Sequence, residues 1–126
     1  RTNAAYAIEY ASALSGANPW TAWVRLPMTN LSATLRPTQP INPSVFYRAY
    51  ELQANPPVLE ALLQPDHSGS VLLYGVPGRS YRLEQTANLG PTAVWTPGPQ
   101  LNLTSSFAFV HGVSVTTNIF FRAREQ

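Results

Sequence analysis

Bulky apolar residues alternate with small or polar residues in several short stretches of this chain. Residues 6–10 read YAIEY and residues 81–84 read YRLE. Because successive side chains of a strand point to opposite faces, each pattern predicts a half-buried β-strand. Comparable patterns predict strands at residues 20–26, 45–50, 70–76, 93–95, 105–110 and 118–124. With 12 Pro and 7 Gly between these runs, the sequence predicts an all-β fold of short antiparallel strands joined by turns.

One pattern occurs twice along the chain, at a nearly constant offset. Tyr6 and Glu9 match Tyr81 and Glu84, and the later matching pieces are Leu14 with Leu89, Trp20-Thr21 with Trp95-Thr96, Asn30-Leu31-Ser32 with Asn102-Leu103-Thr104, and Phe46-Tyr47-Arg48-Ala49 with Phe120-Phe121-Arg122-Ala123. An internal repeat predicts one structural unit used twice. We therefore expect two small β-sandwich modules in tandem, at residues 1–51 and 70–126, with a linker at residues 52–69.

The second copy has a leading strand that the first copy lacks. Residues 70–76 precede the turn VPGR at residues 76–79, and a Pro-Gly pair favours a type II turn. This turn predicts a hairpin between residues 71–74 and the strand that begins at Tyr81. Residues 58–64 are compatible with a short helix or with a strand that replaces the missing one, and we favour the helix.

Composition excludes several classes of protein. Charged residues make up 11% of the chain, against about 25% in typical soluble domains, so the surface is largely neutral and suits an extracellular module or an assembly subunit. All 8 basic residues are Arg, and they form no run, which argues against a nucleic-acid partner. The chain has no Cys and therefore no disulfide or thiolate metal site. No apolar run approaches the ~20 residues that cross a bilayer, so membrane insertion is not expected. Since the chain opens on Arg1, we expect a processed form or a piece of a longer protein.

The second copy carries a longer ordered set of residues: PGRSYRLE at 77–84, Asn88-Leu89, Trp95-Thr96 and FFR at 120–122. This set resembles the small immunoglobulin/fibronectin-III-like β-sandwich repeats of large secreted and surface proteins of bacteria. The resemblance covers the second copy fully and the first from Tyr6 to Ala49. It implies an extracellular, non-catalytic role and no particular ligand or cofactor.

The two copies place a Glu and an Arg at matching positions in strands expected to lie together. We predict two cross-strand pairs with a structural role, Glu9 with Arg48 and Glu84 with Arg122. Such a pair contributes about 0.2–1 kcal/mol. A catalytic role would require a second carboxylate nearby in each copy, and the sequence shows none.

Tryptophan occupies matching positions in the two copies. Trp20 and Trp95 are expected to pack in the core against the Tyr strands. Trp23 has no match in the second copy, and with Trp20 it suggests an alternative, an exposed aromatic platform for a sugar ring.

The remaining polar motifs predict no chemistry. Asp66-His67-Ser68 lies in a Gly/Pro-containing segment and is expected to be a solvated turn, because triad residues meet through the fold rather than as neighbours. His111, before Gly112, is expected in a turn, and two isolated His residues do not make a metal site. Asn30 and Asn102 match the N-glycosylation pattern, which we attribute mainly to the repeat. We therefore expect no catalytic, metal or cofactor site.

The sequence thus predicts a non-catalytic structural or adhesion module of a secreted or cell-surface assembly, whose partners are other chains or other domains of the same polypeptide. One alternative is a self-polymerising filament subunit, because a neighbouring chain could donate the strand that the first copy lacks. The other alternative is a carbohydrate-binding module that uses Trp20 and Trp23, with a polysaccharide as partner.

Overall fold

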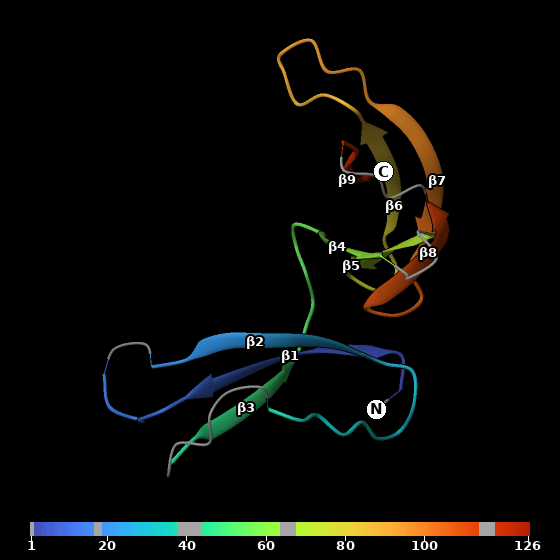
Figure 1. Cartoon of the computed structure of the whole chain (residues 1–126). Helices are drawn as coiled ribbons and strands as arrows, with labels where there is room; N and C mark the ends of the chain where they lie inside the picture. Colours follow the sequence, from blue (N-terminus) through green and yellow to red (C-terminus); the bar gives the residue numbers. More distant parts are fainter. Residues whose placement is uncertain (1, 17–18, 38–43, 64–67, 114–117) are drawn as a thin grey trace. The chain divides into compact units, whose positions relative to one another are not determined.

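The computed structural model describes residues 2–16, 19–37, 44–63, 68–113 and 118–126. Its described part contains only strands and no helix (Figure 1), and all strand pairs are antiparallel. The strands are β1 (Ala4–Ala11), β2 (Thr21–Met28), β3 (Phe46–Glu51), β4 (Val58–Leu63), β5 (Gly69–Tyr74), β6 (Ser80–Thr86), β7 (Thr96–Asn102), β8 (Phe107–Val113) and β9 (Phe120–Glu125). Nowhere in these residues is there a helix long and apolar enough to cross a membrane.

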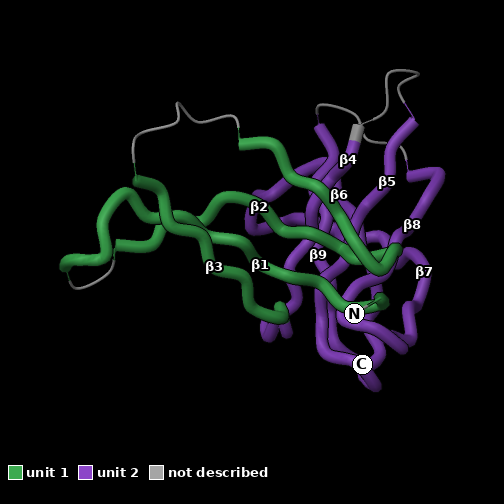
Figure 2. The backbone as a smooth tube through the Cα atoms, turned by 90° about the horizontal axis from the view of Figure 1, so that it is seen from below, with its two compact units in different colours: residues 1–52 green, residues 53–126 purple. Residues whose placement is uncertain are grey.

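The strands form three sheets of three strands, with the orders β2-β1-β3, β4-β5-β8 and β7-β6-β9. The chain divides into two compact units (Figure 2): unit 1 is Arg1–Leu52 and unit 2 is Gln53–Gln126. Unit 1 holds the first sheet and unit 2 holds the other two. The expected all-β class and antiparallel pairing are confirmed.

Unit 2 has the arrangement of a small β-sandwich, in which two sheets share one core. The centre of this core is Leu73 from β5, Tyr81 from β6 and Leu103 just after β7. Partly buried residues of the other strands pack against it: Leu59, Leu101, Ala108 and Ala123. Every strand of unit 2 therefore contributes to burial between the two sheets, which is how antiparallel sheets remove their apolar faces from water.

Unit 1 differs from the sandwich expected there, because its described residues form one sheet only. The segment between β2 and β3 corresponds in chain order to the segment that contains β8 in unit 2. Its described parts, residues 29–37 and 44–45, contain no strand. The sequence predicts that unit 1 lacks one strand of its sandwich. In its described residues, unit 1 lacks the whole second sheet.

The sheets β2-β1-β3 and β7-β6-β9 have the same strand order and the same register. In the first, Ile8 faces Ala49 and Glu9 faces Arg48; in the second, Leu83 faces Ala123 and Glu84 faces Arg122. Each central strand also has a register irregularity next to its Glu, in the pairing with the other edge strand. It lies between Ile8 and Glu9 in β1 and between Arg82 and Glu84 in β6. We call residues at the same place in the two registers counterparts.

The turn before β6 has a counterpart before β1. Gly78 has a φ of 85°, its N–H donates to the carbonyl of Leu103 at 2.7 Å, and the N–H of Arg79 donates to that of Val76 at 3.2 Å. Asn3 has a φ of 61° and its N–H donates to the carbonyl of Met28 at 2.8 Å. Asn is among the few residues with a side chain that adopt this left-handed conformation readily, so Asn3 takes the place of Gly78.

Three local expectations are wrong. The Pro-Gly turn does not join a hairpin, because β5 and β6 belong to different sheets and the turn carries the chain from one to the other. Residues 58–63 form strand β4 rather than a helix, and so the expected linker supplies an edge strand to unit 2. Residues 93–95 precede the strand, which begins at Thr96.

Candidate functional site

Each of the two matching sheets carries a cluster of one Glu, one Arg and one Trp, which we call the Glu–Arg–Trp clusters. In unit 1, Arg48 Nε donates to Glu9 Oε2 at 2.7 Å and its Nη2 lies 2.6 Å from the same oxygen. The Arg48 guanidinium carbon also lies 4.4 Å from the centre of the Trp20 ring. The arginine is thereby held between a carboxylate and an aromatic face, both of which attract it.

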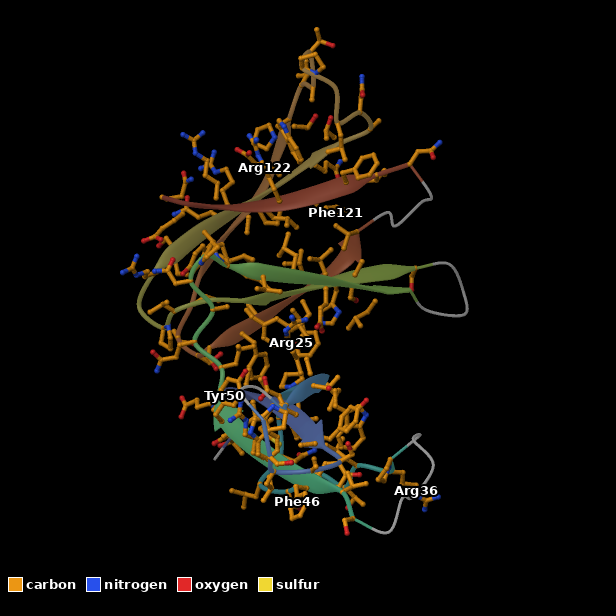
Figure 3. The ribbon with its side chains drawn as sticks, turned by 90° about the vertical axis from the view of Figure 1, so that its left-hand side faces the viewer. Arg25, Arg36, Phe46, Tyr50, Phe121 and Arg122 are labelled. Carbon is orange, nitrogen blue, oxygen red and sulfur yellow. The ribbon has the colours of Figure 1, made fainter. Side chains whose placement is uncertain are left out.

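The cluster in unit 2 has the same geometry. Arg122 Nε and Nη2 both lie 2.6 Å from Glu84 Oε2, and the guanidinium carbon lies 4.1 Å from the centre of the Trp95 ring. The two pairs expected from sequence therefore form as cross-strand neighbours, between β1 and β3 and between β6 and β9. Figure 3 labels Arg122 on β9.

The two clusters have the same pattern of exposure. The Arg side chains are 46% and 44% exposed, whereas the Glu side chains are only 16% and 12% exposed. Each carboxylate is thus covered by its arginine and engaged in charge-assisted hydrogen bonds with it. The arrangement orders the outer face of each sheet.

Unit 1 adds one group to its cluster. The Tyr50 hydroxyl donates to Glu9 Oε1 at 3.1 Å, so both carboxylate oxygens of Glu9 are bonded. Partial burial raises the pKa of Tyr50, and the hydrogen bond to Glu9 and its negative charge raise that pKa further. Tyr50 and Phe46 are both labelled on β3 in Figure 3.

The tryptophans do not occupy the places expected from sequence. Trp20 and Trp95 are half-buried and stack on arginines rather than packing in a core against the Tyr strands. Trp23 is also half-buried, and its ring lies 5.5 Å from that of Tyr47. Because Tyr47 and Arg48 are consecutive in β3, their side chains point to opposite faces. The structure therefore gives Trp20 and Trp23 separate partners rather than one shared platform.

Unit 1 contains an apolar groove of ≈ 350 Å³, which we call the unit 1 groove. Its floor includes Ile8 and Ala49, which face each other across β1 and β3, and its sides include Trp23 and Tyr47. Leu35 and Pro37, from the segment between β2 and β3, line it as well, together with Arg48. The volume is near the lower end of the range of about 300–1,000 Å³ typical of binding sites.

The groove lies on the sheet face whose counterpart is covered in unit 2. The counterparts of Ile8 and Ala49 are Leu83 and Ala123; Leu83 is buried, and Ala123 packs against the unit 2 core. Tyr81 and Leu103 are 1% and 3% exposed, but their counterparts Tyr6 and Met28 are only half-buried. The same face is therefore a core surface in unit 2 and a partly open surface in unit 1.

The groove was not anticipated from sequence. Leu35 and Pro37 carry no distinguishing pattern, and the open face appears only when the two sheets are compared. The sequence signal that points to it is Trp23, which the second copy does not match.

The other polar residues singled out by sequence are not brought together with the groove. His111 lies within β8 rather than in a turn; its Nδ1 is 3.0 Å from Ser70 Oγ and its ring stacks on Phe109. Asp66 and His67 lie outside the described residues. Within the described ranges no group of three His, Cys, Asp or Glu could hold a metal ion.

The two N-glycosylation patterns are not counterparts. Asn102 ends β7, faces Ser80 and accepts a hydrogen bond from its hydroxyl at 2.6 Å. The residue that faces Ala5, the counterpart of Ser80, is Pro27. Asn30 lies in the bend beyond β2 and is exposed, so the equivalence of the two Asn positions expected from sequence is wrong.

Comparison with known proteins adds no relative: no family model, no curated protein and no solved structure matches this chain.

Proposed function

We propose that this chain is a non-catalytic structural or adhesion module of a secreted or cell-surface assembly, built by duplication of a small immunoglobulin/fibronectin-III-like β unit. The observation that carries the proposal is the unit 1 groove, on a sheet face that the matching sheet of unit 2 uses as core. A face with this composition has an affinity for another apolar surface.

Three further features support the proposal. The low content of charged residues suits a surface that is buried in an assembly. The Glu–Arg–Trp clusters hold the outer faces of both sheets in one geometry, which suits a scaffold. Duplication is supported by the common register of the two sheets and by the matching places of Asn3 and Gly78.

The location is tested with antibodies raised against this chain and applied to intact and permeabilised source cells and to the culture medium. We expect labelling of intact cells or a signal in the medium, and a native mass above that of the single polypeptide. A signal seen only after permeabilisation contradicts an extracellular role. A native mass equal to that of the free polypeptide contradicts assembly.

The unit 1 groove also favours a second candidate, a filament subunit that receives a strand from its neighbour. Light scattering after size exclusion, with negative-stain microscopy of the same sample, tests it over a range of protein concentrations. We expect an open-ended series of masses that Ala49→Arg abolishes, because a long cation fills the groove. Leu31→Arg is the matched control, since Leu31 is 86% exposed and does not line the groove. A monomer at every concentration contradicts self-assembly.

The carbohydrate-binding alternative has less support. It requires Trp20 and Trp23 to present one aromatic surface, and these residues contact Arg48 and Tyr47, which point to opposite faces of β3.

A further inference from the structure

The covered face of unit 2 shows what chemistry fits the matching face of unit 1. The strand that supplies the centre of this cover is β5, the central strand of the sheet β4-β5-β8, and all six of its residues are buried. Its Leu73 belongs to the core centre with Tyr81 and Leu103. The covering element is therefore an extended, wholly apolar or small-residue strand rather than a loop or a helix.

The residue after β5 must be small. A methyl group at Gly75 would lie 2.8 Å from Leu103 Cδ1 and from Tyr81 Cε2, which is closer than atoms in contact can approach. The Gly75 backbone therefore rests directly on the Tyr81 ring, and its N–H donates to the carbonyl of Ser106 at 3.1 Å. A strand that covers the unit 1 face in the same way needs Gly at this place.

In unit 1 no strand of the described residues takes the place of β5. The central strand β1 is already paired on both sides, with β2 and β3, so what is open is a face of the sheet and not a gap inside it. The segment of residues 29–37 stands between β2 and β3 as β8 stands between β7 and β9, and its Leu35 and Pro37 line the groove. In unit 2 the corresponding strand β8 is hydrogen-bonded to β5, so this segment is positioned beside the space that a β5-like strand would fill.

We propose that the unit 1 groove binds a β-strand with the chemistry of β5, supplied by a neighbouring polypeptide chain. The strand is extended, carries Leu at the position of Leu73 and ends in Gly at the position of Gly75. It lies over Tyr6, Met28 and Ala49, the counterparts of the residues that pack with Leu73 in unit 2, and it reaches the groove at Ala49 with its edge toward residues 31–36. This inference rests on the proposed assembly role and names the partner that the groove would take.

The test uses a synthetic peptide with the sequence of residues 68–76, SGSVLLYGV, added to the full chain. Trp23 lines the groove, so its fluorescence reports occupation, and Trp23→Phe identifies the signal. The control peptide carries the Leu73→Asp change. We expect saturable binding that weakens by at least about tenfold in Ala49→Arg and with the control peptide, and that Leu31→Arg leaves unchanged.

A tethered form separates weak affinity from lack of fit. The sequence of residues 57–75 is fused directly before Arg1, because Asn3 takes the place of Gly78 and the connection then repeats the one between β5 and β6. We expect the fused strand to raise the unfolding temperature of unit 1, and the fused Leu73→Asp version to leave it unchanged. If the free peptide does not saturate and the fused strand has no effect, the inference is wrong.

Two other outcomes also contradict it. Peptide binding that Ala49→Arg leaves unchanged would place the peptide elsewhere. Self-association that Ala49→Arg abolishes but the peptide does not displace would identify a second copy's sheet face, not a strand, as the occupant. Failure of both the peptide and the fused strand, with an extracellular, high-mass assembly, would reject this inference and leave the proposed function standing. A monomeric chain that still binds the peptide would reject self-assembly alone.

Discussion

At the scale of single residues, the two Glu–Arg–Trp clusters are the most regular feature of the chain. Each cluster joins two strands of one sheet by charge-assisted hydrogen bonds and stacks its arginine on an indole ring. In each pair the Glu lies on the central strand and the Arg on an edge strand, so the pair fixes the register of these two strands. Its energetic contribution is modest, because the arginines are nearly half exposed and water screens them.

The first prediction concerns the Glu84–Arg122 pair. Glu84→Gln and Arg122→Leu, measured singly and together by urea unfolding, are expected to give a coupling of about 0.2–1 kcal/mol. Glu9→Gln and Arg48→Leu form the matched cycle in unit 1. Because these are surface pairs, 1 M salt should reduce both couplings. A coupling above about 3 kcal/mol, the range of buried pairs, would contradict this assignment.

The second prediction concerns Tyr50, whose pKa is raised above 10.0 by partial burial and by Glu9. A raised pKa means that the folded protein favours the neutral phenol. The contribution of Tyr50 to stability is therefore complete below pH 10.0 and is lost as pH rises through the folded pKa. The difference between the ultraviolet titrations of the native chain and Tyr50→Phe should be a single tyrosine with a midpoint above pH 10.0. Glu9→Gln should lower its pKa; an unchanged titration in Glu9→Gln would show that Glu9 plays no part.

At the scale of strands and sheets, the same sheet is used in two environments. The sheet β7-β6-β9 packs against β4-β5-β8 and its inner residues form a core. The sheet β2-β1-β3 has the same register but, in the part of unit 1 that the structure describes, no second sheet. Counterpart residues therefore provide paired experiments, in which the local strand context is constant and only the cover differs.

Ala49 and Ala123 are such a pair, and they give the third prediction. Ala49 is exposed, whereas Ala123 is half-buried and packs against the unit 2 core. Ala49→Arg should change stability by no more than about 0.5 kcal/mol, as surface substitutions do. Ala123→Arg should cost about 2–4 kcal/mol, because it overpacks the core and brings a charge to its edge. Urea unfolding of both variants checks this, with Ala49→Leu and Ala123→Leu as uncharged controls. Equal costs at the two positions would show that unit 1 is covered as unit 2 is.

How far the sequence predicts this fold depends on the range of the interaction concerned. Alternation at Tyr6, Ile8, Tyr81 and Leu83 is local, and it locates β1 and β6 correctly. The Glu–Arg pairs also follow, because the repeat places both partners at matching positions. The sequence favours a helix where β4 forms, because VLEALL suits either period and only pairing with β5 decides between them.

The remaining errors concern contacts that no local pattern contains. A Pro-Gly turn predicts a reversal of the chain, but whether its strands pair or separate into two layers depends on β8 and β9, far along the sequence. Trp20 and Trp95 were expected in a core because they are large and apolar; their stacking on arginines from distant strands is visible only in three dimensions. The groove is a further example, because it depends on which segments of the chain cover Ile8 in three dimensions.

At the scale of the whole chain, the two units differ in how much of their sheet surface is removed from water. Unit 2 has two sheets and a core to which every strand contributes. Unit 1 has one sheet in its described part, and its Tyr6 and Met28, the counterparts of the unit 2 core residues Tyr81 and Leu103, are only half-buried. A three-stranded sheet with one apolar face is close to the minimum that folds in water. The two units therefore should not have the same stability.

The fourth prediction is that β1 opens more readily than β6, and native-state hydrogen exchange measures it. The strands β1 and β6 are the central strands of matching sheets, and each is hydrogen-bonded to two neighbouring strands. The backbone pairing is therefore the same, and the difference in amide protection depends on how well each sheet face is covered. We expect the protection of Ile8 to be lower than that of Leu83 by at least about tenfold, since less apolar area must be exposed to open β1. The peptide of residues 68–76 should raise the protection of Ile8 and leave that of Leu83 unchanged. Equal protection of the two strands without peptide would mean that unit 1 is already as well covered as unit 2, and would remove the basis for a strand-accepting groove.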